Sequence, residues 1–106
     1  MTESEGIKKA FVRLRKYNWL VLNFNNKKAN NPGIRAHTDW LIGKEKNHLI
    51  YVEVKIGKDE LSKEQKDFIK MIAWFMGLPN SRIRVYIVKT AKEAEQLSDN
   101  ILQGKL

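Results

Sequence analysis

Two oppositely charged residues stand two positions apart in a run that is otherwise typical of a β-strand. Glu53 and Lys55 lie in the segment Leu49–Ile56, which is rich in β-branched residues. Because side chains alternate between the two faces of a strand, both charges point to the same face, roughly 6.5–7 Å apart along the strand. That spacing lets a carboxylate and an ammonium group act on one small ligand.

A second carboxylate comes from a neighbouring segment. Asp39 belongs to a short run with strand character, Thr38–Ile42, and can stand beside Glu53. Paired carboxylates near an ammonium group suit a hard divalent cation such as Mg²⁺, which binds one or two carboxylates together with phosphate oxygens. Glu53 and Lys55 can equally be surface charges that form a weak ion pair. The residues alone allow both interpretations.

The elements that would position these residues alternate between helix and strand patterns. Apolar residues at helical spacing predict helices over Glu3–Tyr17, Ser62–Met76 and Ala91–Leu102. Strand patterns cover Trp19–Phe24, Thr38–Ile42, Leu49–Ile56 and Arg82–Val88. Ser62 and Gln65 have the spacing of a capping box, and Asn18 is suited to end the first helix. We therefore expect one α/β domain over residues 1–106, with the order α-β-β-β-α-β-α.

The positive charge of the chain is concentrated before Asp39. The 106 residues contain 20 Lys and Arg against 12 Asp and Glu, a net charge of +8. Gly6 to Thr38 holds eight basic residues and no acidic one, so this third of the chain accounts for the whole excess. Such one-sided charge favours a polyanionic partner, above all nucleic acid. The predicted nucleic-acid contacts are Lys8, Lys9, Arg13, Lys16, Lys27, Lys28, Arg35 and, after the third strand, Lys58.

Composition excludes several classes of protein. The sequence has no cysteine, so it has no disulfide, no thiolate zinc site and no cysteine nucleophile. The longest wholly apolar run, Met71–Met76, is far shorter than the roughly 18–20 residues of a membrane-spanning helix. The acidic start of the chain is unlike the basic start of a signal peptide. We therefore expect an intracellular protein with no membrane partner.

The sequence resembles the PD-(D/E)XK nuclease superfamily and, within it, the stand-alone form of the virus-type replication-repair nuclease (VRR-NUC) domain. The residues that carry the similarity are Gly33 leading to Asp39, Glu53-Val54-Lys55 as the (D/E)-X-K motif, and Gly57 followed by Leu61-Ser62 and Gln65. Thr38 and Asn18 stand where this family usually has Pro and Gly. The resemblance implies a restriction-endonuclease-like core, with a mixed central sheet flanked by helices.

The resemblance also implies roles for the central residues. Asp39 and Glu53 would hold Mg²⁺ or Mn²⁺ together with the backbone carbonyl of Val54. Lys55 would position the attacking water and offset negative charge that develops on the phosphorus centre.

Two residues outside the strands complete the implied site. Glu5 would serve as an outer-sphere or second-metal ligand, with Glu3 as the other available acid in the first helix. Gln65 would reach back from the start of its helix toward the metal or the scissile phosphate. Gln65 is also the capping-box glutamine, and the two roles are compatible.

The function implied is metal-dependent hydrolysis of DNA phosphodiesters, by an endonuclease selective for branched DNA or Holliday junctions. Stand-alone domains of this kind look like symmetric dimers, which would place two sites on a four-way junction. They are frequent in phage genomes, and the expected location is cytoplasmic or nucleoid-associated. The alternative is a non-catalytic nucleic-acid-binding module with the same fold. Intact Asp39, Glu53 and Lys55 favour the enzyme, because a simple DNA binder gains nothing from carboxylates that face phosphate.

Overall fold

A computed structural model describes residues 1–24 and 38–106. In chain order its elements are α1 (Glu3–Val12), the 3-10 helix η1 (Arg13–Tyr17), β1 (Leu20–Asn23), β2 (Trp40–Gly43), β3 (Leu49–Val54), α3 (Lys63–Met76), β4 (Ile83–Val88) and α4 (Ala91–Leu102). This is the predicted order. No helix in the described part of the chain combines the length and apolar character needed to cross a membrane.

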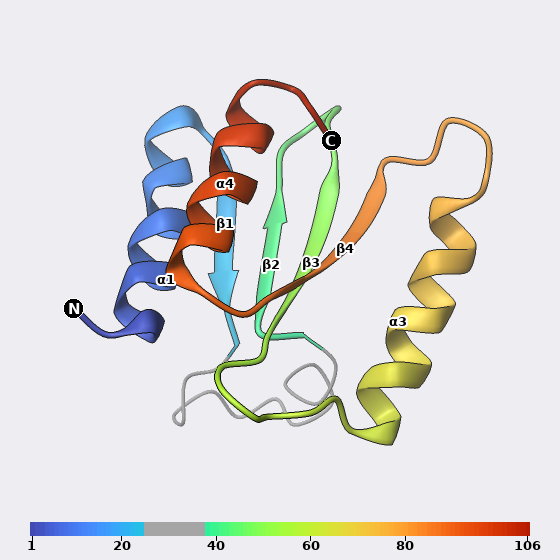
Figure 1. The fold of residues 1–106 in the computed structure, drawn as a ribbon. Helices are drawn as coiled ribbons and strands as arrows, with labels where there is room; N and C mark the ends of the chain where they lie inside the picture. Colours follow the sequence, from blue (N-terminus) through green and yellow to red (C-terminus); the bar gives the residue numbers. More distant parts are fainter. Residues whose placement is uncertain (25–37) are drawn as a thin grey trace.

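The four strands form one mixed sheet in the order β1-β2-β3-β4 (Figure 1). The first two pairings are antiparallel, and β3 pairs with β4 in parallel. A parallel pair needs a crossover connection, which α3 supplies. As a result β1, β3 and β4 all finish at the end of the sheet where β2, α3 and α4 begin.

One face of the sheet carries the hydrophobic core. Trp40, Ile42, Ile50 and Val52 alternate along β2 and β3, and each is almost fully buried. Helices α1 and α4 lie side by side over this face (Figure 1). The rings of Phe11 and Trp40 meet edge to face, with centroids 5.3 Å apart, and join α1 to the sheet.

Helices α1 and α4 approach each other closely where both begin. A Cβ atom on Gly6 would lie 2.5 Å from the Cβ of Ala91, so only glycine fits this point of α1. The start of α4 is held by a capping box, in which Thr90 and Glu93 exchange side-chain-to-backbone hydrogen bonds. The carboxylate of Glu3 also accepts a hydrogen bond from the backbone N–H of Ala91, at 2.8 Å.

Helix α3 packs beside β4 rather than over the core (Figure 1). Of its fourteen residues, all of which the structure describes, only Ile72 is buried. The ring of Phe68 meets that of Tyr51 on β3 edge to face, with centroids 5.2 Å apart. Tyr51 points away from the core because its neighbours Ile50 and Val52 point into it, so α3 covers part of the opposite face of the sheet.

Helix α4 has its predicted bounds, and most of the other elements are shorter than predicted. The predicted helix over Glu3–Tyr17 narrows to a 3-10 turn at Arg13, and Asn18 ends it in the left-handed conformation with φ 67°, as expected. Strand β3 ends at Val54 rather than Ile56. The backbone N–H of Lys55 still donates to the carbonyl of Val88 at 2.9 Å, so strand-like pairing continues to Lys55.

Candidate active site

Asp39 and Glu53 lie opposite each other at the end of the sheet where β3 finishes. Trp40 pairs with Val52, and the backbone N–H of Asp39 donates to the carbonyl of Val52 at 3.0 Å. Extending this antiparallel register by one residue sets Asp39 against Glu53 on the face away from the core. The predicted pairing of the two carboxylates is therefore present.

Backbone and side-chain hydrogen bonds fix the start of β2. The backbone N–H of Val54 donates to Oδ2 of Asp39 at 2.7 Å and orients this carboxylate. The buried hydroxyl of Thr38 lies 2.8 Å from the carbonyl oxygen of Trp40 and 3.1 Å from that of Val52. Thr38 therefore links β2 to β3. The VRR-NUC domains that this sequence resembles usually have proline at this position.

Glu53 is a buried acid with an incomplete set of partners. It is 3% exposed. Its Oε1 accepts a hydrogen bond from Nε2 of Gln65 at 2.6 Å and lies 3.5 Å from Nζ of Lys55. Its Oε2 is buried and has no hydrogen-bond partner among the residues that the structure describes. A buried carboxylate oxygen without a partner is costly, which points to a missing ligand at this atom.

The surroundings of Glu53 favour its protonated form when no cation is bound. Burial raises its pKa to about 8, and the negative charge of Asp39 acts in the same direction. Lys55 opposes the shift because its ammonium group stabilises the carboxylate. A carboxyl group with a strongly raised pKa beside a second acid is a common feature of functional sites.

The side chain of Gln65 completes the predicted capping box and also reaches Glu53. Its Oε1 accepts a hydrogen bond from the backbone N–H of Ser62 at 2.8 Å, and Ser62 Oγ accepts one from the backbone N–H of Gln65 at 3.2 Å. These two bonds complete the capping box that begins α3. The amide nitrogen is left to donate to Glu53. The start of α3 is thereby attached to the candidate site.

The acid expected from the first helix does not join the two carboxylates. Within the described residues no three His, Asp or Glu side chains gather closely enough to hold one metal ion, so Glu5 stands apart from Asp39 and Glu53. Glu3 is engaged at the start of α4, as described above. Glu5 is exposed, and its backbone N–H donates to Thr2 as part of the α1 cap.

The basic residues predicted to contact nucleic acid differ in their surroundings. Lys8, Lys16 and Lys58 are exposed. Arg13 instead binds α4, because its Nη2 lies 2.6 Å from Oδ1 of Asp99 and 2.8 Å from Oγ of Ser98. Lys9 lines a hollow together with Arg13 and with Glu95 and Asp99 of α4. The remaining predicted contacts, Lys27, Lys28 and Arg35, lie outside the described residues, as does Gly33.

A groove of about 410 Å³ opens beside Lys55. It is lined by Lys55, Asp59, Glu60, Leu61, Lys66, Ile87 and Lys89. Lys89 is absent from the sequence-based site. The strand register could have identified Lys89. Because Val54 pairs with Val88 in parallel strands, the next residues of the two strands, Lys55 and Lys89, lie side by side. The groove leads from the candidate site toward α3, and three lysines line it.

The fold matches that of a known domain. A solved structure described as a VRR_NUC domain aligns with this chain with a TM-score of 0.65 and 20% sequence identity, covering 93% of this chain and 97% of that one. No family model and no curated protein matches the sequence. A likeness at this identity establishes the fold. The predicted mixed α/β fold and its resemblance to the VRR-NUC domain are confirmed, and the chain has a VRR_NUC-like fold.

Proposed function

We propose that this protein is a divalent-metal-dependent nuclease that hydrolyses phosphodiester bonds in DNA. The observation that carries the proposal is the carboxylate of Glu53, which is buried beside Asp39 and Lys55 with one oxygen unpartnered. A surface ion pair would be exposed and would have no buried oxygen without a partner. The VRR_NUC-like fold supports the same conclusion, because that fold belongs to a nuclease superfamily.

The donor set fits a hard divalent cation. Asp39 and Glu53 supply carboxylate oxygens, and the backbone carbonyl of Val54 would be a third ligand, as the resemblance implies. A cation at Oε2 of Glu53 would satisfy the unpartnered atom and would remove the repulsion between the two acids. Mg²⁺ and Mn²⁺ both suit oxygen ligands of this kind.

The residues of the chain then have separate tasks in hydrolysis. When bound, the cation would lower the pKa of a water molecule and offset charge on the phosphate. The Val54 N–H holds Asp39, and Gln65 holds Glu53, so both carboxylates are oriented before substrate arrives. The ammonium group of Lys55 would orient the attacking water and stabilise the added negative charge on phosphorus.

Exposed lysines would hold the DNA backbone on either side of the cleaved bond. Lys8, Lys16 and Lys58 have the exposure that phosphate contacts require. Lys66 and Lys89 line the groove beside Lys55 and would receive the strand that leaves the site. Since Arg13 is bound to Asp99, we assign it to the joint between α1 and α4 rather than to DNA.

The proposed substrate is branched DNA, including four-way junctions, and the proposed working form is a homodimer. Both follow from the resemblance to stand-alone VRR-NUC domains. Trp74 is 65% exposed and Met71 is 51% exposed on α3, and Leu78 is exposed just after the helix. Such an apolar group is suited to a two-fold symmetric contact. Replacing Trp74 with Asp should convert the dimer to a monomer in analytical ultracentrifugation.

Cleavage assays test the proposed reaction. The protein is incubated with labelled single strand, linear duplex and four-way junction, each with Mg²⁺, Mn²⁺ or EDTA. We expect metal-dependent cleavage that favours the junction and that is lost in Asp39→Asn and Lys55→Ala. Junction binding in EDTA should be retained by both variants. Cleavage of none of the substrates with either metal would contradict the enzyme proposal.

The same assays identify the competing function, a non-catalytic nucleic-acid-binding module. That module would bind the junction without cutting it, and Lys55→Ala would then weaken binding by no more than the replacement of an exposed lysine does. The unpartnered oxygen of Glu53 argues against this outcome, because simple phosphate binding does not require a buried acid.

A further inference from the structure

The groove beside Lys55 lies on the same face of the sheet as the two acids. Lys55 lines the groove, and its Nζ lies 3.5 Å from Oε1 of Glu53, so the groove and the candidate active site share a side chain. Ile87 also lines the groove and is the partner of Glu53 in the parallel register. The next residue, Val88, is buried in the core, so Ile87 points to the face that carries Glu53. A substrate held at the acids therefore has the groove directly beside it.

Apolar surface in this groove is open to solvent. Ile87 is 41% exposed, and Leu61 lines the groove with part of its side chain accessible. A single exposed isoleucine is ordinary on a protein surface. This one stands opposite a buried acid, in a groove that continues from the acid. It can therefore contact an uncharged part of a substrate whose phosphate lies at the candidate site.

The charges around this apolar surface have both signs. Lys66 and Lys89 are exposed, and among the described residues neither forms an ion pair. Asp59 and Glu60 are exposed acids of the same lining. Two acids disfavour a long run of phosphates along the groove, whereas unpaired lysines attract the phosphates nearest to them. The lining therefore suits a short piece of one strand rather than an extended backbone.

The size of the groove limits what can occupy it. Its volume of about 410 Å³ falls in the range of roughly 300–1,000 Å³ for pockets that enclose a small ligand. In a duplex the faces of each base are covered by its neighbours, and only the edges reach a protein. A base can lay its face on Ile87 only after it leaves the stack. The groove therefore suits one unpaired nucleotide.

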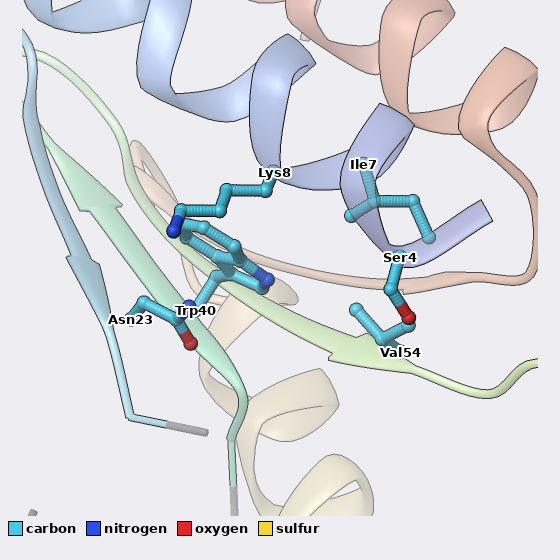
Figure 2. Close-up of a pocket in the computed structure, with 6 residues that line it drawn as sticks. All are labelled: Ser4, Ile7, Lys8, Asn23, Trp40 and Val54. Atoms are coloured by element: carbon cyan, nitrogen blue, oxygen red, sulfur yellow. The ribbon is translucent and has the colours of Figure 1, made fainter. Parts of the chain in front are cut away.

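The hollow on the other face of the sheet has a different character. Figure 2 shows Ile7 and Lys8 of α1 beside Trp40 and Val54 at the strand ends, around a volume of about 160 Å³. Ile7 and Trp40 are core residues with 2% and 4% exposure, so this hollow offers little apolar surface. Val54 and Lys55 are consecutive in an extended segment and face opposite sides of the sheet. The sheet therefore separates this hollow from the acids, whereas the groove adjoins them.

We propose that the groove beside Lys55 receives one unpaired nucleotide of the substrate strand, the neighbour of the phosphodiester that is cleaved. The base contacts Ile87 and Leu61, and the adjoining phosphates bind Lys66 and Lys89. This proposal rests on the proposed nuclease function and adds Ile87 as a residue that determines specificity. Substrates with an unpaired nucleotide beside the cleavage point are favoured, because their base enters the groove without leaving a stack.

Steady-state kinetics on the four-way junction test the role of Ile87. Ile87→Ser should raise KM about fivefold with little change in kcat, because it removes apolar contact and leaves every proposed metal ligand in place. Ile87→Phe should return KM to the wild-type value or below it, since an aromatic ring stacks on a base. Leu20→Ser is the control, because Leu20 is 62% exposed on β1 and lies outside the groove. Equal effects of Ile87→Ser and Leu20→Ser would overturn the proposal.

Modified substrates test the nucleotide itself. The base is removed from the nucleotide on either side of the mapped cleavage point, which leaves the phosphate backbone intact. One of the two abasic substrates should raise the KM of the wild type about fivefold, because no base fills the groove. The same substrate should change the KM of Ile87→Ser little, since the contact is already absent. If base removal and Ile87→Ser act additively, the base lies elsewhere and the proposal is wrong.

A binding measurement without metal separates failure of this proposal from failure of the nuclease function. In EDTA, the methyl resonances of Ile87 are followed by NMR as a single-stranded deoxytrinucleotide is added. The buried Ile7 and Ile50 serve as internal references. We expect Ile87 to shift, and Lys89→Ala should raise the concentration that is needed. Neither inorganic phosphate nor a trinucleotide backbone without bases should reproduce the shift.

The two proposals predict different failures. Ile87 resonances that do not move, or that move equally with the backbone that lacks bases, overturn the nucleotide site whatever the cleavage assays give. A base-dependent shift of Ile87 in a protein that cleaves no substrate overturns the nuclease function and leaves a groove that binds single strands.

Discussion

Helices α1 and α4 bury four residues each, whereas α3, the longest helix in the described chain, buries only Ile72. The first two helices form a layer over the apolar face of the sheet (Figure 1). Helix α3 lies beside β4 and covers part of the other face through the contact of Phe68 with Tyr51. Asp39 and Glu53 belong to the face that α3 covers. The strongly packed side therefore supports the fold, and on the lightly packed side Asp39 stays partly exposed beside the buried Glu53.

The contrast has a physical basis in what each face of β3 presents. Ile50 and Val52 are fully buried and gain the full hydrophobic benefit of α1 and α4. Tyr51 and Glu53 on the other face are partly polar, and complete coverage by a helix would seal the acids from solvent and metal. Near Glu53, α3 is attached by the hydrogen bond from Gln65 rather than by apolar packing.

The largest expected effect is the difference in stability lost when one phenylalanine is truncated on α1 and one on α3. Phe11 on α1 is fully buried, so Phe11→Ala should lower the free energy of unfolding by about 3–5 kcal/mol. Phe75 on α3 is only partly buried, and Phe75→Ala should cost less than about 2 kcal/mol. Urea denaturation of both variants measures the two values. Similar losses would mean that α3 contributes to the core as much as α1 does.

Replacing the buried acid should separate activity from stability. Glu53→Gln removes a proposed metal ligand, and we expect the cleavage rate to fall by more than about a hundredfold. Replacing a residue that only orients a metal ligand already lowers activity about 10- to 100-fold. Stability without metal should be retained or improved, because glutamine is neutral beside Asp39 without having to take up a proton. Activity near that of the wild type would remove Glu53 from the mechanism.

The pH dependence of stability provides a separate test of the same residue. The pKa of Glu53 rises from 4.5 to about 8 on folding, so between these values the folded protein keeps a proton that the unfolded chain releases. Without metal, this group's contribution to stability is full below pH 4.5, falls as pH rises toward 8 and is constant above that value. Denaturant unfolding from pH 6.5 to 9 should show the decline.

Glu53→Gln is the control for the pH dependence, because its stability should change less over the same range. Mg²⁺ should reduce the decline in the wild type, since a bound cation favours the ionised carboxylate. Parallel curves for the wild type and Glu53→Gln would show that the pKa of Glu53 is not raised by folding.

The smallest expected effect concerns the groove on the α3 side. Lys89→Ala should raise KM by a few-fold with kcat little changed, because a lysine at an exposed site contributes one modest phosphate contact. Lys92→Ala, an exposed lysine on α4 outside the groove, is the matched control. If Lys92→Ala has the same effect, general charge rather than the groove determines DNA affinity.

Much of the site could be predicted because it depends on local periodicity. Strand alternation places Glu53 and Lys55 on one face, and the three-residue spacing of Ser62 and Gln65 predicts the capping box that is observed. The pairing of Asp39 with Glu53 needed one further assumption, that the two segments are neighbouring strands.

The remaining features depend on contacts between distant segments. The charge pattern alone predicts that Arg13 contacts DNA, whereas the packing of α1 on α4 brings Asp99 to its guanidinium group. The same packing separates Glu3 from Glu5. Helices α1 and α4 approach closely at Gly6, so the backbone N–H of Ala91 can donate a hydrogen bond to the Glu3 carboxylate. Charge counting treats all lysines and arginines alike and therefore could not separate Lys8 from Arg13.

Two helices of this protein begin with the same motif but complete it with different residues. Thr90 is paired with Glu93 at the start of α4, and Ser62 is paired with Gln65 at the start of α3. Glutamate and glutamine are interchangeable in a capping box, since the backbone N–H requires only an oxygen acceptor. Beside Glu53 they are not interchangeable, because only the amide can donate. A Gln65→Glu protein would form the same helix start but would bring a third acidic side chain to Asp39 and Glu53. The amide at this position is therefore explained by the neighbouring carboxylate and not by the capping box.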